Sequence, residues 1–185
     1  MTTAPVERPL SLEEFLEFEA AAERKHEYVA GYIYALAGAG RRHNRIAGRI
    51  FGRIEQPAEA RSSEAFGSDQ LLKASTAAGD VCYYPDLQVV CDPTDQNERY
   101  SEWPCIIVEV LSESARRLDR GEKLEAYTGI PSLQAYLVVW QDQRRVERHW
   151  RHDDEWHLET IVDDGVVLFP CIDVELTLDD IYGPR

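Results

Sequence analysis

The sequence predicts an α+β fold, close to α/β, in which helices flank a mixed central β-sheet. Two apolar runs, at residues 87–91 and 105–111, have the length and β-branched content of buried strands. An amphipathic pattern in residues 41–56 is typical of a helix that covers such a sheet. Short alternating segments after residue 133 predict extra C-terminal β-hairpins. We expect one domain over residues 1–185, with a flexible tail at its N-terminus over residues 1–10.

The N-terminal part begins with a helix over residues 11–25, because the sequence Ser-Leu-Glu-Glu at its start forms a capping box. A strand rich in Tyr, Val and Ile follows over residues 27–37. Gly40 interrupts this pattern before the amphipathic helix, and Pro57 predicts the end of that helix.

The rest of the chain alternates strands, turns and one further long helix. That helix is charged and amphipathic, and we expect it to stop before Gly129 and Pro131. The predicted elements are, in order, a strand at 64–73, a polar turn at 75–80, the two apolar strands joined by a polar loop at 92–103, the helix at 114–127, a hairpin of strands at 133–140 and 144–150, strands at 156–162 and 166–169, and a short helix at 177–181.

Each of the two apolar runs carries a carboxylate. Asp86 follows Pro85 at the start of the first run, and Glu109 lies inside the second run. A carboxylate in a buried strand is costly unless it is paired or binds a metal. If the runs pair antiparallel so that Asp92 faces Trp103, the same register places Asp86 opposite Glu109, about 5 Å away. Two such carboxylates could hold one divalent cation.

Each acidic residue also has a simpler explanation. Asp86 could be a turn residue at the start of a strand, since Asp favours such positions. Glu27 could end a helix and pair with Arg24. Glu109 is the hardest to explain in this way, because its neighbours on both sides are apolar.

Eight short motifs follow one another along the chain. They are Glu27-Tyr28-Val29-x-Gly31, His43-Asn44, Gly67-Ser68-Asp69, Pro85-Asp86, Glu109-Val110-Leu111-Ser112, Asp119-Arg120-Gly121-Glu122-Lys123, Ala126-Tyr127 and Pro131-Ser132-Leu133. In this order they resemble the PD-(D/E)XK restriction-endonuclease-like superfamily and, more narrowly, the Uma-type endonucleases. The chain departs from the superfamily pattern at Leu111, where the general pattern has Lys, and Lys123 on the next helix would replace it. It also has Ser112-Glu113-Ser114 where the family usually shows Ser-Pro-Ser.

The resemblance implies a restriction-endonuclease-like core and a Mg²⁺-dependent endonuclease, with Mn²⁺ as a possible substitute. Asp86 and Glu109 would bind the metal with help from Glu27, and Lys123 would support the attacking water. It also implies a nucleic-acid partner, most simply DNA, and a homodimer. The residues expected to support the site are Asp119, Tyr127, Gln88, Asp69, His43 and Asn44.

Two of these positions have alternatives in the sequence. Lys123 lies at i+4 spacing from Asp119, so the two could form a surface ion pair that contributes little. His43 and Asn44 open the amphipathic helix, where backbone N–H groups favour an anion. A histidine at the position of His43 is more often a helix cap or a surface residue than a ligand.

The charge of the chain both opposes and allows a nucleic-acid function. Its formal net charge of −14 is unlike that of most nucleic-acid binders. Residues 41–53 are a local exception, because they contain five arginines and no acid. At helical spacing four of them form a stripe, which is either a solvated helix face or a ridge that tracks phosphates beside the carboxylates. The stripe consists of Arg42, Arg45, Arg49 and Arg53.

The cysteines and the N-terminus favour a cytoplasmic protein. No apolar stretch approaches the roughly 20 residues that cross a bilayer, and the N-terminus lacks the apolar core of a secretion signal. We expect no membrane partner. The four cysteines contain no C-x-x-C pair, and we expect reduced thiols, with Cys91 and Cys105 acting as small hydrophobic residues.

Two functions compete with the endonuclease. A nuclease-fold module could bind nucleic acid or a protein partner without catalysis, in which case the arginines would matter and the carboxylates would not. A pair of acids could also serve a glycosidase, although that reading gives Lys123 and the basic helix no role. No G-x-G-x-x-G, P-loop or G-x-S-x-G motif supports a nucleotide-binding or serine-hydrolase function.

Overall fold

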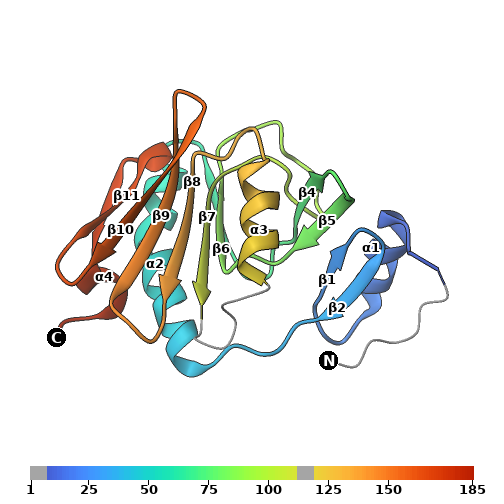
Figure 1. Ribbon diagram of the computed structural model, residues 1–185, viewed down its shortest axis with the longest axis horizontal. Coiled ribbons are helices and arrows are strands. Elements are labelled where there is room, and N and C mark those ends of the chain that lie inside the picture. Colours follow the sequence, from blue (N-terminus) through green and yellow to red (C-terminus); the bar gives the residue numbers. More distant parts are fainter. Residues whose placement is uncertain (1–7, 112–118) are drawn as a thin grey trace.

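A six-stranded mixed sheet forms the centre of the computed structural model, which describes residues 8–111 and 119–185 (Figure 1). The strand order is β10-β9-β8-β7-β6-β3; β7 and β8 run parallel, and the other neighbours are antiparallel. This confirms the predicted α+β class with a mixed central sheet. The strands are β3 (Glu64–Gly67), β6 (Leu87–Val90), β7 (Pro104–Leu111), β8 (Ala135–Trp140), β9 (Arg145–His152) and β10 (Glu155–Val162).

Two smaller sheets complete the β structure. A four-stranded sheet has the order β2-β1-β5-β4, and the C-terminal region contains a two-stranded sheet. The first of these lies with α1 to the right of the central sheet in Figure 1. The strands are β1 (His26–Val29), β2 (Tyr32–Ala35), β4 (Leu72–Thr76) and β5 (Gly79–Tyr83), and then β11 (Val166–Phe169) and β12 (Val174–Thr177).

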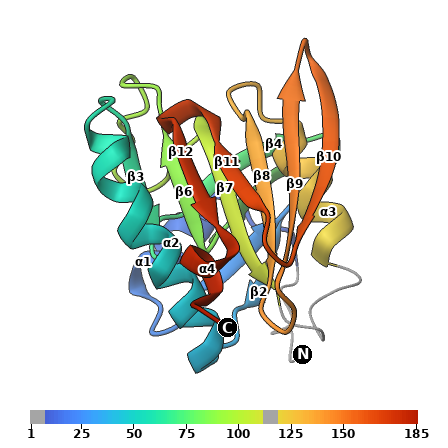
Figure 2. The same ribbon diagram turned by 90° about the vertical axis from the view of Figure 1, so that its left-hand side faces the viewer.

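Helices cover both faces of the central sheet. Helices α2 (Arg41–Glu59) and α4 (Leu178–Tyr182) lie on one face with β11 and β12, whereas α3 (Asp119–Thr128) lies on the other (Figure 2). The alternation of β7 explains this arrangement, because successive side chains point to opposite faces. Val108 packs in the same core cluster as α2, while Ile107 packs with α3. Glu109 therefore points to the α3 side.

Helix α2 is longer than the sequence predicts. It continues through Pro57 to Glu59, although proline removes one backbone hydrogen bond. Ile54 and Ala58 are both fully buried, so the turn around Pro57 keeps its apolar contact with the sheet.

Two predicted β segments each divide at a turn. Residues 27–37 form the hairpin β1-β2 rather than one strand, with Ala30 and Gly31 at positive φ in the turn. Gly31 has a φ of 99° and packs against Pro9, so a side chain would be strained there. Residues 64–73 contain β3 and β4, which belong to different sheets, and the predicted turn at 75–80 is the hairpin that joins β4 to β5.

Two further expectations are corrected. Arg8, Pro9 and Leu10 are not a free tail, because the amide of Leu10 donates to Gly31 and Leu10 packs beside α1; residues 1–7 lie outside the described part of the chain. Cys91 and Cys105 are joined by a disulfide, so the expectation of reduced thiols is wrong for these two residues.

Helix α1 (Leu12–Ala21) has the predicted capping box. Within the described residues, no helix combines the length and apolar character needed to cross a membrane.

Candidate active site

A cleft of about 540 Å³ opens where α2 begins, beside β1, β6, β7 and α3. The chain between β2 and α2 passes along the lower end of the central sheet (Figure 1). It supplies part of the wall of the cleft. The predicted acids converge here, and each of them comes from a different part of the chain. The charged and titratable residues that line the cleft are Lys25, Glu27, His43, Tyr84, Asp86, Glu109 and Lys123.

Asp86 and Glu109 lie next to each other at the end of the paired segment of β6 and β7. Leu87 pairs with Val108, so extending the antiparallel register by one residue places Asp86 opposite Glu109. Asp86 itself stands one residue before β6, and its Oδ2 atom accepts a 2.7 Å hydrogen bond from the amide of Val110. The predicted register therefore holds at the carboxylates.

The register changes further along the same pair. A bulge between Val89 and Val90 shifts the pairing, so that Val90 faces Pro104. The expected opposition of Asp92 and Trp103 is wrong for this reason, since a bulge adds one unpaired residue to one strand.

Glu109 is a buried acid in a crowded electrostatic environment. Its side chain is 7% exposed, and its Oε1 atom accepts a 2.9 Å hydrogen bond from the hydroxyl of Tyr127. Burial raises the pKa of Glu109 to about 7; Lys123 opposes this shift, whereas the charges of Asp86 and Glu27 add to it. The site therefore holds several negative groups close enough to repel one another.

Lys123 is buried between two of these acids. Its Nζ atom lies 2.8 Å from Oε1 of Glu27 and 3.4 Å from Oε1 of Glu109. It also lies 5.2 Å from the ring centre of Tyr83, a geometry that favours a cation. The alternative of a surface ion pair with Asp119 is wrong for Lys123, whose exposure is only 7%. The side chain of Asp119 lies outside the described residues.

Glu27 belongs to a strand and not to a helix end. It lies on β1, is 8% exposed and faces Lys123. The alternative in which Glu27 ends a helix and pairs with Arg24 is therefore excluded.

The N-terminus of α2 closes another side of the cleft. Gly40, His43 and Asn44 all line it. The Nε2 atom of His43 lies 3.0 Å from Oδ2 of Asp86, and this contact raises the pKa of the histidine. Because α2 has 19 residues and Gly40 has no side chain to cap it, its first N–H groups can receive an anion at the cleft.

Two predicted supporting residues lie outside this arrangement. Gln88 is fully buried, and it donates to the backbone of Gln70 and accepts from Ser101 instead of reaching the acids. Asp69 is exposed and forms an ion pair with Lys25. It therefore reaches the cleft only through that lysine.

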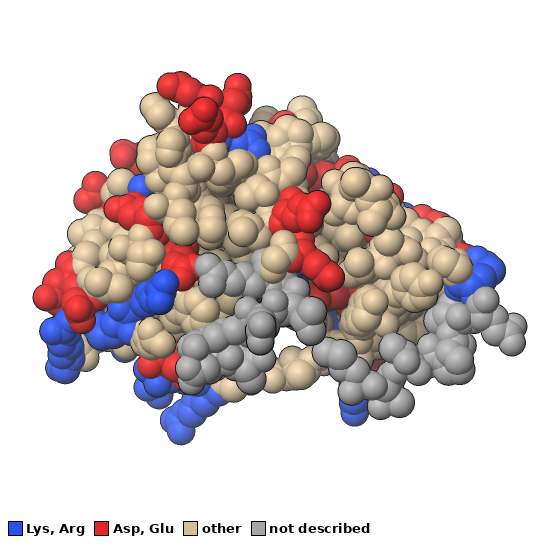
Figure 3. Space-filling model, viewed as in Figure 1, with Lys and Arg blue, Asp and Glu red and all other residues tan. Residues whose placement is uncertain are grey.

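The arginine stripe is not beside the carboxylates. At about 100° per residue, Arg42, Arg45, Arg49 and Arg53 lie on roughly the opposite side of α2 from the residues that line the cleft. Arg53 instead pairs with Asp180 of α4 at 3.0 Å. In Figure 3 acidic side chains are spread over the visible face, and many basic ones lie along its lower edge. The prediction of a basic ridge next to the acids is wrong.

Sequence reasoning did not single out Lys25, Tyr83 and Tyr84. Lys25 and Tyr84 line the cleft, with the ammonium 5.1 Å from the tyrosine ring centre. The hydroxyl of Tyr84 donates to Glu19, and burial raises its pKa. Their positions in the sequence could have indicated that they lie near the acids. The two tyrosines immediately precede Pro85 and Asp86, and Lys25 stands two residues before Glu27.

The acids fit a hard divalent cation in type and in charge. Carboxylate oxygens are the ligands that Mg²⁺ prefers, and both known contacts of Asp86 use Oδ2. With Lys123 protonated, three ionised acids leave two negative charges. Among the described residues, however, Glu27, Asp86 and Glu109 do not form a group of three ligand atoms within 4.8 Å of one another. Asp86 and Glu109 therefore fit as the metal pair, with Glu27 bound to the lysine.

Comparison with known proteins agrees with this architecture. A crystal structure from Anabaena variabilis, described as a "putative nuclease belonging to DUF820", superposes with a TM-score of 0.72 at 20% identity and covers 94% of this chain and 98% of its own. Two uncharacterized Synechocystis proteins are similar in sequence. Protein slr1290 is 31% identical over 94% of this chain and 91% of its own length, and sll1609 is 32% identical over 83% and 88%.

The family model named Uma2, with the description "Putative restriction endonuclease", matches residues 12–179. That range includes every residue of the cleft discussed above. The chain therefore belongs to the Uma2 family.

Proposed function

We propose that the protein is a metal-dependent endonuclease that hydrolyses phosphodiester bonds of nucleic acid, most simply DNA. The observation that carries this proposal is the burial of Lys123 between Glu27 and Glu109, with Asp86 alongside, in one cleft. A purely structural ion pair needs neither the third acid nor a cleft. The family description supports the same reaction class.

Asp86 and Glu109 would hold Mg²⁺ or Mn²⁺ in this proposal. When bound, the cation would lower the pKa of a water molecule and neutralise charge on the scissile phosphate. The hydrogen bond from Val110 fixes Asp86, and the one from Tyr127 fixes Glu109, so the two carboxylates are oriented before any ligand arrives.

Lys123 would act on the phosphate or on the attacking water. Glu27 holds its ammonium at 2.8 Å, which sets its direction. A fixed positive charge in a partly buried cleft stabilises developing negative charge more than a mobile one in water. The N-terminus of α2 would receive a neighbouring phosphate through its N–H groups.

The net charge of −14 shapes the expected substrate. Lys25, His43 and Lys123 are the only basic side chains among the described residues of the cleft wall. Much of the phosphate affinity would then depend on the bound cation, and we expect slow cleavage of long duplex DNA at physiological salt. A homodimer and a cytoplasmic location remain part of the same proposal.

The proposal is tested by cleavage assays at low salt with duplex, single-stranded and branched DNA and with RNA. Wild-type protein should cleave at least one of these substrates only when Mg²⁺ or Mn²⁺ is present. Glu109→Gln and Lys123→Met should each lower the rate by a factor on the order of 10² or more. Glu175→Gln is the control, since Glu175 is exposed on β12. Metal-dependent binding without any cleavage would instead indicate a non-catalytic nucleic-acid module.

A further inference from the structure

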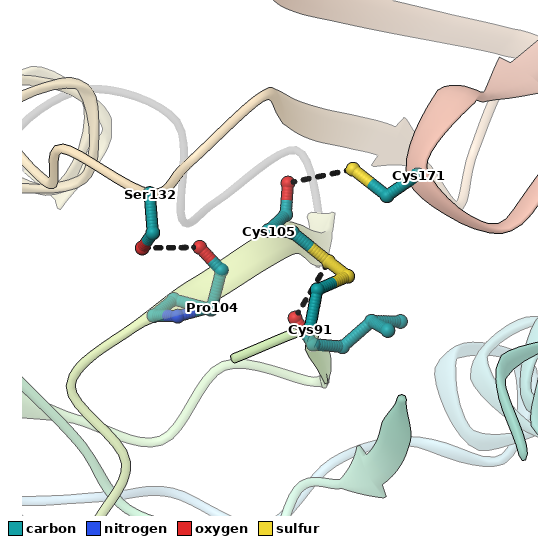
Figure 4. Close-up of a disulfide and its surroundings, with 6 residues drawn as sticks. Cys91, Pro104, Cys105, Ser132 and Cys171 are labelled. Carbon is teal, nitrogen blue, oxygen red and sulfur yellow. Dashed lines mark hydrogen bonds between the residues drawn. A yellow bond between two sulfur atoms is a disulfide. The ribbon is translucent and has the colours of Figure 1, made fainter. Parts of the chain in front are cut away.

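Three of the four cysteines meet on the far side of the central sheet from α3. Cys91 follows β6, Cys105 lies on β7, and Cys171 lies on the short helix η2 (Pro170–Ile172) between β11 and β12. Their sulfur atoms all lie within 4.8 Å of one another. Figure 4 shows the Cys91–Cys105 disulfide with Cys171 beside it, donating to the carbonyl of Cys105 at 3.7 Å. Three chain segments thus place three sulfurs at one point.

We propose that this cluster, once the disulfide is reduced, is a Zn²⁺ site in which Cys91, Cys105 and Cys171 are the ligands. No other group of three His, Cys, Asp or Glu side chains in the described residues brings its ligand atoms so close together. Thiolates are the ligands that Zn²⁺ takes most often in structural sites.

The spacing of the sulfurs suits this ion. A Zn–S bond is about 2.3 Å, so neighbouring sulfurs of a tetrahedral site lie about 3.8 Å apart. Reduction would separate the sulfurs of Cys91 and Cys105 to about this distance, and the sulfur of Cys171 lies within 4.8 Å of both. Forming the site would therefore require adjustment of the cysteine side chains.

Solvent would supply the fourth ligand. Cys105 is 1% exposed, whereas Cys91 and Cys171 are only partly buried. A water molecule would complete the tetrahedron from the side of these two partly exposed residues. Three thiolates and one Zn²⁺ carry a net charge of −1, which the partial exposure makes less costly than in a closed core.

The chemistry requires two steps. A phosphine reductant attacks one sulfur, its electron pair breaks the S–S bond, and hydrolysis of the phosphonium gives the phosphine oxide and two thiols. Zn²⁺ then replaces three S–H protons, which pass to solvent.

This site is distinct from the carboxylate cleft. Cys105 stands four residues before Glu109 on β7, a separation of about 13 Å along a strand. Soft sulfur ligands also select a different ion from hard carboxylate oxygens. Because Cys171 connects the β11-β12 hairpin to the central sheet, the ion would fasten these two parts together.

Cobalt titration tests the proposal, since Co²⁺ bound to thiolates has a charge-transfer band and Zn²⁺ does not. Reduced, desalted wild-type protein should develop this band up to one Co²⁺ per chain, and Zn²⁺ should abolish it. The oxidised protein should show no band. Cys171→Ser should lose the band, whereas Cys82→Ser should keep it, because Cys82 is buried in the separate cluster around Phe15 and Tyr28.

Circular dichroism shows whether Cys171→Ser still folds, and Cys91→Ser provides a second variant with the same expected loss. Absence of the band from reduced wild-type protein would overturn the proposal. So would an unchanged band in folded Cys171→Ser, or an equal loss in Cys82→Ser. None of these readouts depends on cleavage, so the proposed nuclease activity is tested separately.

Discussion

The ammonium of Lys123 lies 2.8 Å from a carboxylate oxygen of Glu27. The two side chains are 9% and 10% exposed, so the pair is held away from water. Lys123 lies on α3 and Glu27 lies on β1, so the pair connects two parts of the fold at the cleft. We therefore expect the Lys123–Glu27 pair to contribute to the stability of this region as well as to the chemistry of the cleft.

Replacing Lys123 should destabilise the protein in the absence of metal. Lys123→Met leaves Glu27 and Glu109 buried without their cation, and removing one partner of a buried pair costs about 3–5 kcal/mol. Urea unfolding in EDTA measures this. The double variant Glu27→Gln with Lys123→Met should recover part of the loss. Strictly additive effects of the two changes would show that the residues do not interact.

The stability of the metal-free protein should depend on pH through Glu109. Burial raises its pKa from 4.5 to about 7, so folding favours the protonated form. Its stabilising contribution is complete below pH 4.5 and is lost as the pH rises to about 7. Relative to Glu109→Gln, which cannot ionise, wild-type protein should lose stability across that window. Parallel stability curves for the two proteins would contradict the buried position of the acid.

Removing the hydroxyl of Tyr127 should weaken metal binding. It donates to Glu109 at 2.9 Å, and loss of such a supporting hydrogen bond typically costs about 10–100-fold in metal affinity. Calorimetry with Mn²⁺ on Tyr127→Phe measures the effect. Tyr182→Phe is the control, because its hydroxyl donates to the backbone of Arg145 and Tyr182 does not line the cleft. Equal losses in both variants would point to a general effect of the substitution.

The arginines of α2 should not contribute to the cleft. Arg42 and Arg45 face away from it, so changing both to Ala should leave the affinity of a short oligonucleotide and its salt dependence unchanged. Lys25→Ala should lower the slope of log affinity against log salt by about 0.7–0.9, the value for one phosphate contact. If the double arginine variant lowered this slope by the equivalent of about two phosphate contacts, the arginine stripe would contact the substrate after all.

The sequence predicts that the two carboxylates lie on neighbouring strands, because apolar runs of strand length define β6 and β7. The antiparallel register considered for these runs holds from Leu87 to Val89 and places Asp86 opposite Glu109. The bulge at Val89 and Val90 has no sequence signal of that kind, so the far end of the pair was misplaced. Turns inside β-rich segments were missed where only one glycine marks them, as at Gly31.

The partners of Lys123 could not be predicted from spacing alone. Helical periodicity places Asp119 near it, but the tertiary fold brings Glu27 from almost a hundred residues earlier. The arginine stripe fails for a related reason. Periodicity shows that these residues share a face of α2, yet only the packing of α2 on the sheet decides which face meets the cleft.

Mn²⁺ titration of the acidic pair tests the central claim most directly. Mn²⁺ prefers oxygen ligands, so the cysteine cluster does not compete for it. Calorimetry should show one site per chain in wild-type protein and in Glu175→Gln, and Asp86→Asn with Glu109→Gln should abolish it. Full binding by that folded double variant would contradict the assignment of the metal to Asp86 and Glu109.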